Sequence, residues 1–172
     1  MIVPEQFRQI MRQLAAGVTV ITTELDGKPH GMTATAFTPL SLDPPLVLVC
    51  VNRSSDTAQA LASGAYFGVN ILDASQSALA ARFAGKAPAR YVWDDVEHRF
   101  APHGAALLSG CAAALEARLS RILEGGDHRI YIGEIVWGTR TPNAEPLVYH
   151  QGRFHGLRPV VEPAPAVRKE AV

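Results

Sequence analysis

The sequence predicts a small antiparallel β-barrel with short helices packed outside it, a mainly β fold in a single domain. Six or more segments have the composition or alternation of β-strands, and most are joined by turns short enough for hairpins. Only three segments have helical spacing. No G-x-G-x-x-G motif follows the first strand, which disfavours a parallel dinucleotide-binding sheet. A length of 172 residues with 48% hydrophobic residues is enough for one buried core.

The chain begins with a predicted amphipathic helix and a hairpin. In residues 4–15, the spacing i, i+3, i+4 places Phe7, Ile10, Met11, Leu14 and Ala15 on one helical face. Residues 17–37 then form two predicted strands around Asp-Gly at positions 26 and 27, a strong signal for a two-residue turn.

A buried strand and a capped helix are predicted next. Two consecutive prolines precede the unbroken apolar run 46–51, which predicts a strand buried on both faces. Residues 53–64 are predicted as a helix capped by Ser54 or Ser55 and ended by Gly64. Residues 66–72 are predicted as a strand.

The second half continues with a helix, a loop and a long hairpin. Asp73 and Gln76 have the spacing of a capping box for a helix over 75–85. Residues 86–110 are expected to be loop-rich, and two alternating runs in 111–138 are joined by a Gly-Gly-Asp turn. Residues 146–157 contain one last short strand. The domain is expected to span 1–158, with a disordered Pro- and Ala-rich tail over 159–172.

Composition excludes several classes of function. Sixteen basic and sixteen acidic residues give no net charge, so neither nucleic acid nor a membrane is an expected partner. No apolar run is long enough to span a membrane, and the first residues lack the apolar block of a signal peptide, so we expect a cytoplasmic protein. Cys50 and Cys111 are expected to be buried thiols. No C-x-x-C, H-E-x-x-H or G-x-S-x-G motif occurs, which disfavours a metal site and a hydrolase.

A candidate anion site lies at the start of the helix predicted over 53–64. Asn52, Ser54, Ser55 and Thr57 cluster there, where backbone N–H groups without helical partners attract anions. An ordinary N-cap needs only one of these side chains, and it is the alternative interpretation.

The segment Thr33, Ala34, Thr35, Ala36 approaches the predicted buried strand with small and hydroxyl side chains. Threonine is common on ordinary sheet surfaces, but small residues also allow a flat ring to approach the backbone. His128 follows the Gly-Gly-Asp turn without being required by it. It is either a solvated turn residue or a group that binds a ligand or transfers a proton.

Five segments in this order closely resemble the short-chain NAD(P)H:flavin oxidoreductase family: FRQIMRQLAAGVTVITT, GMTATAFTPLSLDPPLVLVCVNRSSDTAQAL, YFGVNIL, ARFAG and GGDHRIYIGEI. Members of that family supply reduced flavin to two-component monooxygenases and halogenases. The resemblance covers roughly residues 5–157, and several motifs in the right order are more specific than any one of them.

The resemblance implies a split β-barrel homodimer that binds FMN or FAD near the subunit interface and uses NADH or, less favoured, NADPH. Residues 33–37 would line the isoalloxazine and ribityl chain, residues 52–57 the phosphate, and Arg82 with Phe83 a second phosphate and ring contact. His128 would lie beside the nicotinamide, as the catalytic-site histidine. Many relatives carry Ser-Ser where this chain has Thr35-Ala36, so one flavin contact differs.

The resemblance also implies a downstream flavin-dependent oxygenase as partner. Two alternatives stay open. One is a split-barrel flavoenzyme with tightly held flavin, similar to pyridoxamine-phosphate oxidases, and the other is a flavin-binding module without turnover.

Overall fold

The computed structural model describes residues 1–85 and 92–159, so the predicted tail lies outside the described residues apart from Pro159. The helices are α1 (Pro4–Met11), α2 (Asp56–Ser63) and α3 (Ser77–Ala84), with a 3-10 turn η1 (Ala74–Gln76) before α3. The strands are β1 (Ala16–Gly17), β2 (Thr19–Leu25), β3 (Lys28–Ala34), β4 (Phe37–Leu42), β5 (Pro45–Asn52), β6 (Tyr66–Ile71), β7 (His98–Phe100), β8 (Ala106–Leu108), β9 (Ala113–Gly125), β10 (His128–Arg140), β11 (Val148–His150) and β12 (Arg153–His155).

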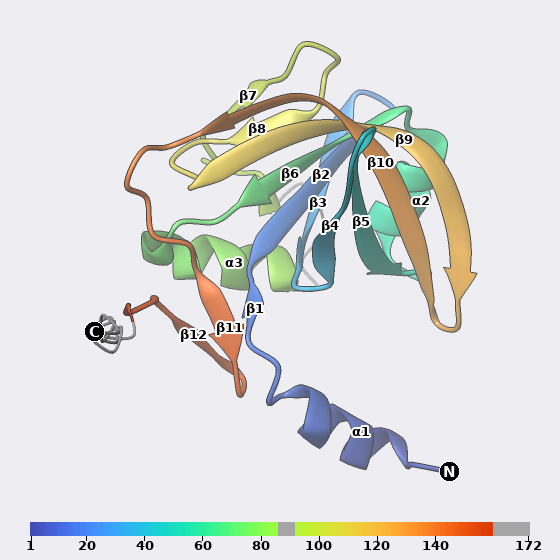
Figure 1. Ribbon diagram of the computed structural model, residues 1–172. Helices are drawn as coiled ribbons and strands as arrows, with labels where there is room; N and C mark the ends of the chain where they lie inside the picture. The colour runs from blue at the N-terminus through green and yellow to red at the C-terminus, as the bar shows by residue number, and fades with distance from the viewer. Residues whose placement is uncertain (86–91, 160–172) are drawn as a thin grey trace, which may run out of the picture.

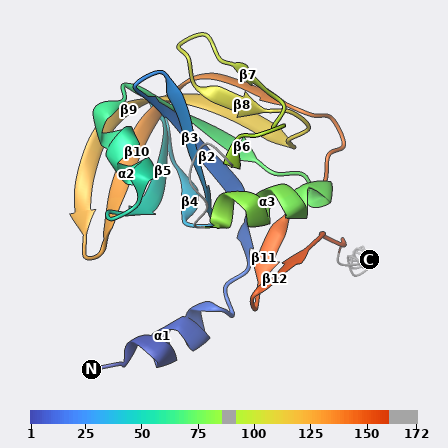
Figure 2. The ribbon, with the colours of Figure 1, turned by 180° about the vertical axis from the view of Figure 1, so that it is seen from behind.

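The main sheet is antiparallel and coils into a barrel (Figure 1). Its seven strands follow the order β3-β2-β6-β9-β10-β5-β4. The two edge strands, β3 and β4, are consecutive in the chain and are separated only by Thr35 and Ala36, which brings the two edges of the sheet together. Helix α3 packs on the outside of this sheet, and α2 packs against the core that the sheet encloses (Figure 2). The prediction of a mainly β antiparallel barrel with short helices is confirmed.

Two apolar clusters hold the barrel and its outer layer together. One lies between β2, β5, β6, β9, β10 and α2, where Ile21, Phe67 and Tyr131 are fully buried. The other packs α3 on β2 through Val20, Phe83 and neighbouring residues. Because clusters lie on both faces of β2, this strand is buried continuously instead of on alternate residues.

Local signals placed the turns and helix ends correctly. Asp26 and Gly27 have φ of 53° and 70° and join β2 to β3, as a two-residue hairpin turn requires. Ser55 caps α2, and Gly64 ends it. Asp73 and Gln76 form both hydrogen bonds of the predicted capping box.

Three expectations about strands were wrong. Strand β5 is buried only on alternate residues, with Val47, Val49 and Val51 inside and Cys50 half-buried, because its second face has no complete cover. The loop-rich region contains the short hairpin β7–β8. The last segment is a hairpin, β11–β12, because Gln151 and Gly152 turn the chain with positive φ.

Cys111 is buried as expected, and burial raises the pKa of its thiol to about 12. None of the helices in the described residues has the length and apolar character needed to cross a membrane.

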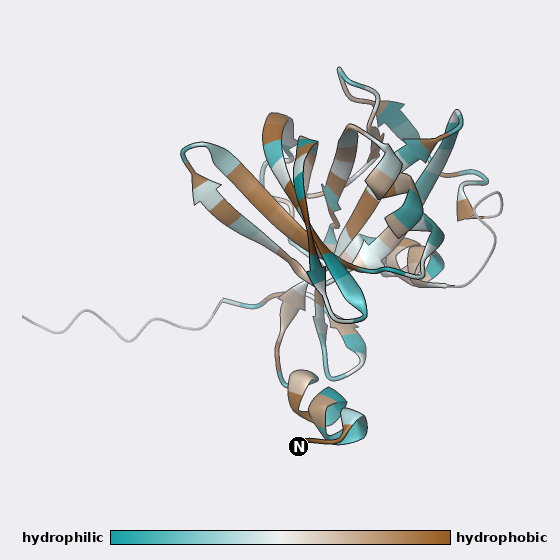
Figure 3. Cartoon of the chain, turned by 90° about the vertical axis from the view of Figure 1, so that its right-hand side faces the viewer, coloured by the Kyte–Doolittle hydropathy of each residue, from teal (hydrophilic) through white to brown (hydrophobic). Residues whose placement is uncertain are grey.

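Helix α1 projects from the barrel, and its apolar face is uncovered (Figure 3). None of its residues is buried, and Phe7, Ile10, Met11 and the following Leu14 are all exposed. The predicted amphipathic helix is therefore present, but this chain alone does not bury its apolar side.

Candidate functional site

The turn that carries His128 meets the loop at the start of α2. His128 lies directly opposite Asn52 in the pairing of β10 with β5. The backbone N–H of Arg53 donates to the carbonyl of Asp127 at 3.1 Å. Nδ1 of His128 lies 2.8 Å from Oδ1 of Asp127, and this hydrogen bond holds the pKa of the Asp127 carboxyl below its usual value. The fold thus brings together two groups of predicted site residues that are distant in sequence.

The start of α2 combines an ordinary cap with unused donors. Oδ1 of Asn52 accepts hydrogen bonds from the N–H and the hydroxyl of Ser54, at 2.9 and 2.7 Å. The hydroxyl of Ser55 accepts the N–H of Ala58 at 3.1 Å. The N–H groups of Asp56 and Thr57 have no such side-chain cap among the described residues, and the first N–H groups of a helix lack helical partners. They can therefore donate to an anion.

A cavity of about 510 Å³ opens beside these donors. Strand β3, the start of α2, the end of α3 and the segment after the undescribed residues 86–91 surround it. Its lining includes three of the predicted phosphate-side serine and threonine residues together with Asn52, Thr33 and Phe83. The full lining is His30, Gly31, Met32, Thr33, Asn52, Ser54, Ser55, Asp56, Thr57, Phe83, Ala84, Gly85, Val92 and Trp93.

A second cavity, of about 460 Å³, adjoins the first at the end of β3, and a third, of about 410 Å³, adjoins the second. Thr33 lines the first and second cavities, and Thr35 lines the second and third. Ala36 and the apolar side of α1 line the third, and Tyr149 lines the second and third. We call these three adjoining cavities the groove. It runs from the start of α2, past the small residues between β3 and β4, to α1.

Not every predicted site residue presents its side chain to the groove. The Thr33 hydroxyl donates to the Ala80 carbonyl at 2.7 Å, so it fixes α3 to β3. Ala34 is buried in the core. Arg82 on α3 donates to the carbonyl of Asp94, and it is absent from the lining of the three cavities. His128 is absent from that lining too, although it adjoins Asn52 at the end of the groove.

Sequence reasoning missed Trp93 and Tyr149 as lining residues. Trp93 lies in the region expected to be loop-rich, and Tyr149 in the segment expected to be a single strand. The one feature of the sequence that could have indicated these lining residues is the presence of a large aromatic side chain in each segment.

Comparison with known proteins gives the family. The model of the flavin reductase like domain matches residues 11–158, which is most of the chain. The chain belongs to this family.

Relatives of this flavin reductase-like chain are named as flavin reductases or as reductase subunits of monooxygenases. It is 38% identical over 157 residues to an NADH-dependent FAD reductase of Streptomyces globisporus, covering 90% of this chain and 86% of the relative. It is 33% identical over 156 residues to HsaB, the reductase subunit of a flavin-dependent monooxygenase of Rhodococcus jostii, covering 91% and 79%.

Solved structures agree in fold with this flavin reductase-like chain. The NADH:FAD oxidoreductase SgcE6 of Streptomyces globisporus, solved with NAD and FAD fragments, matches with a TM-score of 0.86 and 36% identity, covering 94% of this chain and 99% of that one. BorF, the flavin reductase component of a bacterial two-component tryptophan halogenase, matches with a TM-score of 0.85 and 37% identity, covering 92% and 100%.

The groove of this flavin reductase-like chain fits a flavin nucleotide chemically. Helix donors at one end suit a phosphate, although the Asp56 carboxylate on the same lining opposes one electrostatically. At the other end, Thr35 and Ala36 are exposed residues whose small side chains leave room beside their backbone. A flat ring can approach that backbone closely.

Proposed function

We propose that this chain is a flavin reductase that binds FMN or FAD in the groove and reduces it with NADH. One observation carries the proposal. A helix N-terminus with free donors and a segment of small residues lie in adjoining cavities, with Thr33 on the lining of two of them. A phosphate-bearing ligand with a flat ring needs these two features at the two ends of one groove.

The chain's own residues act by binding and orientation. When bound, the flavin accepts hydride from the nicotinamide, and that chemistry belongs to the two cofactors. The N–H groups of Asp56 and Thr57 bind the phosphate, and residues 35 and 36 support the ring. Backbone N–H groups beside the ring are expected to stabilise the negative charge that grows there on reduction. Positioning of the rings supplies several kcal/mol of the barrier, so no side chain has to transfer a proton.

NADH is the preferred reductant in this proposal, and the reduced flavin passes to a separate oxygenase. The relatives named as NADH-dependent reductases and as reductase components of monooxygenases support both points. A cytoplasmic location, where NADH is supplied, stays a prediction.

Oxidation of NADH, followed by its near-ultraviolet absorbance with FMN, FAD or riboflavin added in turn, tests the proposal. Fast oxidation that depends on added flavin is the expected result. A stoichiometric flavin that stays bound and reacts slowly would instead favour the oxidase-like alternative. Flavin binding without turnover with either NADH or NADPH would favour the binding module.

His128 is proposed to bind the nicotinamide without transferring a proton. Replacing it with alanine is expected to raise the KM for NADH more than it lowers kcat, because the ring adjoins the groove from the turn and is partly exposed. Steady-state kinetics with both substrates varied checks this. A loss of kcat beyond about 10³-fold, which is the scale of a main acid or base, would contradict it.

The functional unit is proposed to be a homodimer. Besides the face of α1, the chain exposes Leu42 on β4 and Leu123 on the β9–β10 hairpin, and such apolar surfaces are typical of interfaces. The expected mass in solution is twice the chain mass of 18.5 kDa.

Light scattering after size exclusion measures that mass. We expect Ile10→Glu to shift the protein towards the monomer, because it places a charge on the apolar face of α1. Gln9→Glu places the same charge on the other side of the helix and should leave the mass unchanged. A monomeric wild-type protein would contradict the proposal.

A further inference from the structure

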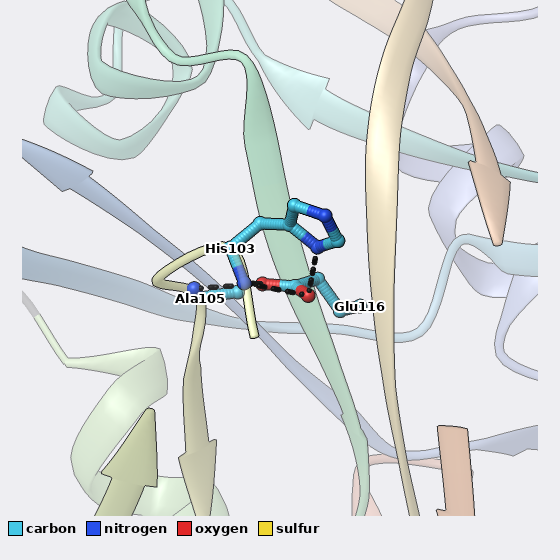
Figure 4. Close-up of polar contacts among 3 residues, drawn as sticks. All are labelled: His103, Ala105 and Glu116. Atoms are coloured by element: carbon cyan, nitrogen blue, oxygen red, sulfur yellow. Dashed lines mark hydrogen bonds and ion pairs between the residues drawn. The ribbon is translucent and has the colours of Figure 1, made fainter. Parts of the chain in front are cut away.

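The tip of the β7–β8 hairpin is held by a carboxylate that no solvent reaches. Glu116 on β9 is 0% exposed, and its two oxygens accept the backbone N–H of His103 at 3.1 Å (Figure 4). One oxygen also accepts the backbone N–H of Ala105 at 3.0 Å, and the other lies 2.8 Å from Nδ1 of His103. The His103 ring stacks on Tyr66. A buried carboxylate is costly unless it is bonded in this way, so the side chain is committed to this one turn.

Two other buried polar side chains hold the rest of the hairpin. The Thr22 hydroxyl donates to the carbonyl of Ala106 at 2.5 Å, and Oδ1 of Asn70 accepts the N–H of Leu108 at 2.7 Å. Like Glu116, both are 0% exposed. We call Thr22, Asn70 and Glu116 the polar clamp. All of its hydrogen bonds to residues 103–108 engage the backbone, except the one to the His103 ring.

A glycine makes room for the clamp. Gly68 on β6 pairs with Thr22 on one side and with Glu116 on the other, so the three form one row across β2, β6 and β9. A Cβ at Gly68 would lie 2.2 Å from the Thr22 hydroxyl oxygen and 2.8 Å from the Ala106 carbonyl oxygen. Only glycine therefore lets the hairpin backbone approach the sheet here.

The same hairpin reaches the groove at its other end. The rings of His98 on β7 and Trp93 pack edge to face, with their centroids 5.1 Å apart. The rings of Trp93 and Phe83 pack in the same way, also with centroids 5.1 Å apart. Trp93 and Phe83 both line the cavity at the start of α2. The indole N–H of Trp93 has no hydrogen-bond partner within the described ranges. The position of this ring consequently depends on the packing of its neighbours, and His98 of the hairpin is one of them, beside Phe83 on α3.

We propose that Glu116 is a positioning residue for the groove: by fixing the tip of the β7–β8 hairpin, it keeps Trp93 in the wall beside the start of α2. The ligand concerned is the flavin of the proposed function, on which this inference rests. Loosening the hairpin weakens flavin binding and leaves the chemistry of bound flavin unaffected, because neither Trp93 nor the hairpin lines the cavities at residues 35 and 36, where the ring is proposed to lie.

Glu116→Gln tests this, because the amide keeps the shape but replaces one accepting oxygen with a donor. The KM for FMN is expected to rise about fivefold with kcat within about twofold. The fluorescence of Trp93 is recorded without flavin in a Trp137→Phe background that leaves one tryptophan. Because Trp137 itself packs on the hairpin, the emission is compared with that of Trp137→Phe alone, and Glu116→Gln should shift it to the red. His103→Ala removes the ring contact with Glu116 and the stacking on Tyr66 but keeps the backbone N–H bonds to Glu116. It should cause a smaller change in the same direction if Glu116→Gln does not fold.

Val47→Ala is the matched control, since it removes methyl groups from the barrel core away from the hairpin. It should lower stability while leaving the KM and the emission unchanged. If Glu116→Gln and His103→Ala also lower stability alone, the clamp is structural and the inference is overturned. Because the emission is read without flavin, it tests the link to Trp93 even if the wild-type protein shows no reductase activity.

Discussion

Replacing Ser54 with glutamate is expected to raise the KM for FMN about tenfold and to leave the KM for riboflavin within about twofold. Ser54 is exposed on the lining of the cavity where the N–H groups of Asp56 and Thr57 are proposed to donate to a phosphate. Two like charges 4 Å apart repel by about 1 kcal/mol in water and by more near a protein surface. A carboxylate at position 54 therefore competes with a flavin phosphate, and riboflavin has no phosphate to repel.

The matched control is Ser63→Glu at the other end of the same helix. Ser63 is also exposed, and its hydroxyl only bonds back to the carbonyl of Gln59. A carboxylate stabilises a helix by about 0.3–1 kcal/mol near its N-terminus and destabilises it by a similar amount near its C-terminus. Ser54→Glu should consequently fold at least as well as Ser63→Glu, so a higher KM in Ser54→Glu alone cannot come from lost stability. Equal increases for FMN and riboflavin would show that the start of α2 does not bind the phosphate.

Features set by neighbours in sequence were predictable. The Asp26-Gly27 turn, the Ser55 cap and the capping box from Asp73 to Gln76 all depend on contacts within three residues. The phosphate end of the candidate site belongs to this class, because a helix N-terminus creates its donors locally. The donors could be placed without knowledge of the barrel, whereas their role in binding a phosphate was implied by the family resemblance.

Features set by distant contacts were not predictable from one sequence. The Thr33 hydroxyl bonds to Ala80, 47 residues away, and nothing in residues 33–37 indicates that partner. The half-buried Cys50 depends on what covers the second face of β5. The β7 and β8 strands are three residues each, too short for an alternating pattern, and distant contacts hold them: the polar clamp and an apolar cluster of the hairpin with Ala114 and Trp137. The Trp93 wall of the groove was missed for the same reason.

Replacing Gly133 with alanine is expected to lower the free energy of unfolding by about 2–3 kcal/mol, the range of an overpacked core. A Cβ at this position of β10 would lie 2.6 Å from two ring atoms of Phe67 and 2.9 Å from the Cβ of Ala117. Phe67 is 1% exposed within the core cluster, so its ring has little room to retreat. The melting temperature, followed by circular dichroism, should fall by about 4–10 °C in a chain of this size.

Alanine in place of a strand glycine normally stabilises by about 0.5–1 kcal/mol, so the direction of the change identifies the steric cause. Gly17→Ala is expected to show that normal effect, because nothing lies within 4 Å of the added Cβ. The double variant Gly133→Ala with Phe67→Leu should lose less free energy of unfolding than the two single variants lose in sum. The smaller side chain at position 67 frees the space that the added methyl group needs. If Gly133→Ala melts at the wild-type temperature, the close packing of β10 on Phe67 is not what makes this position require glycine.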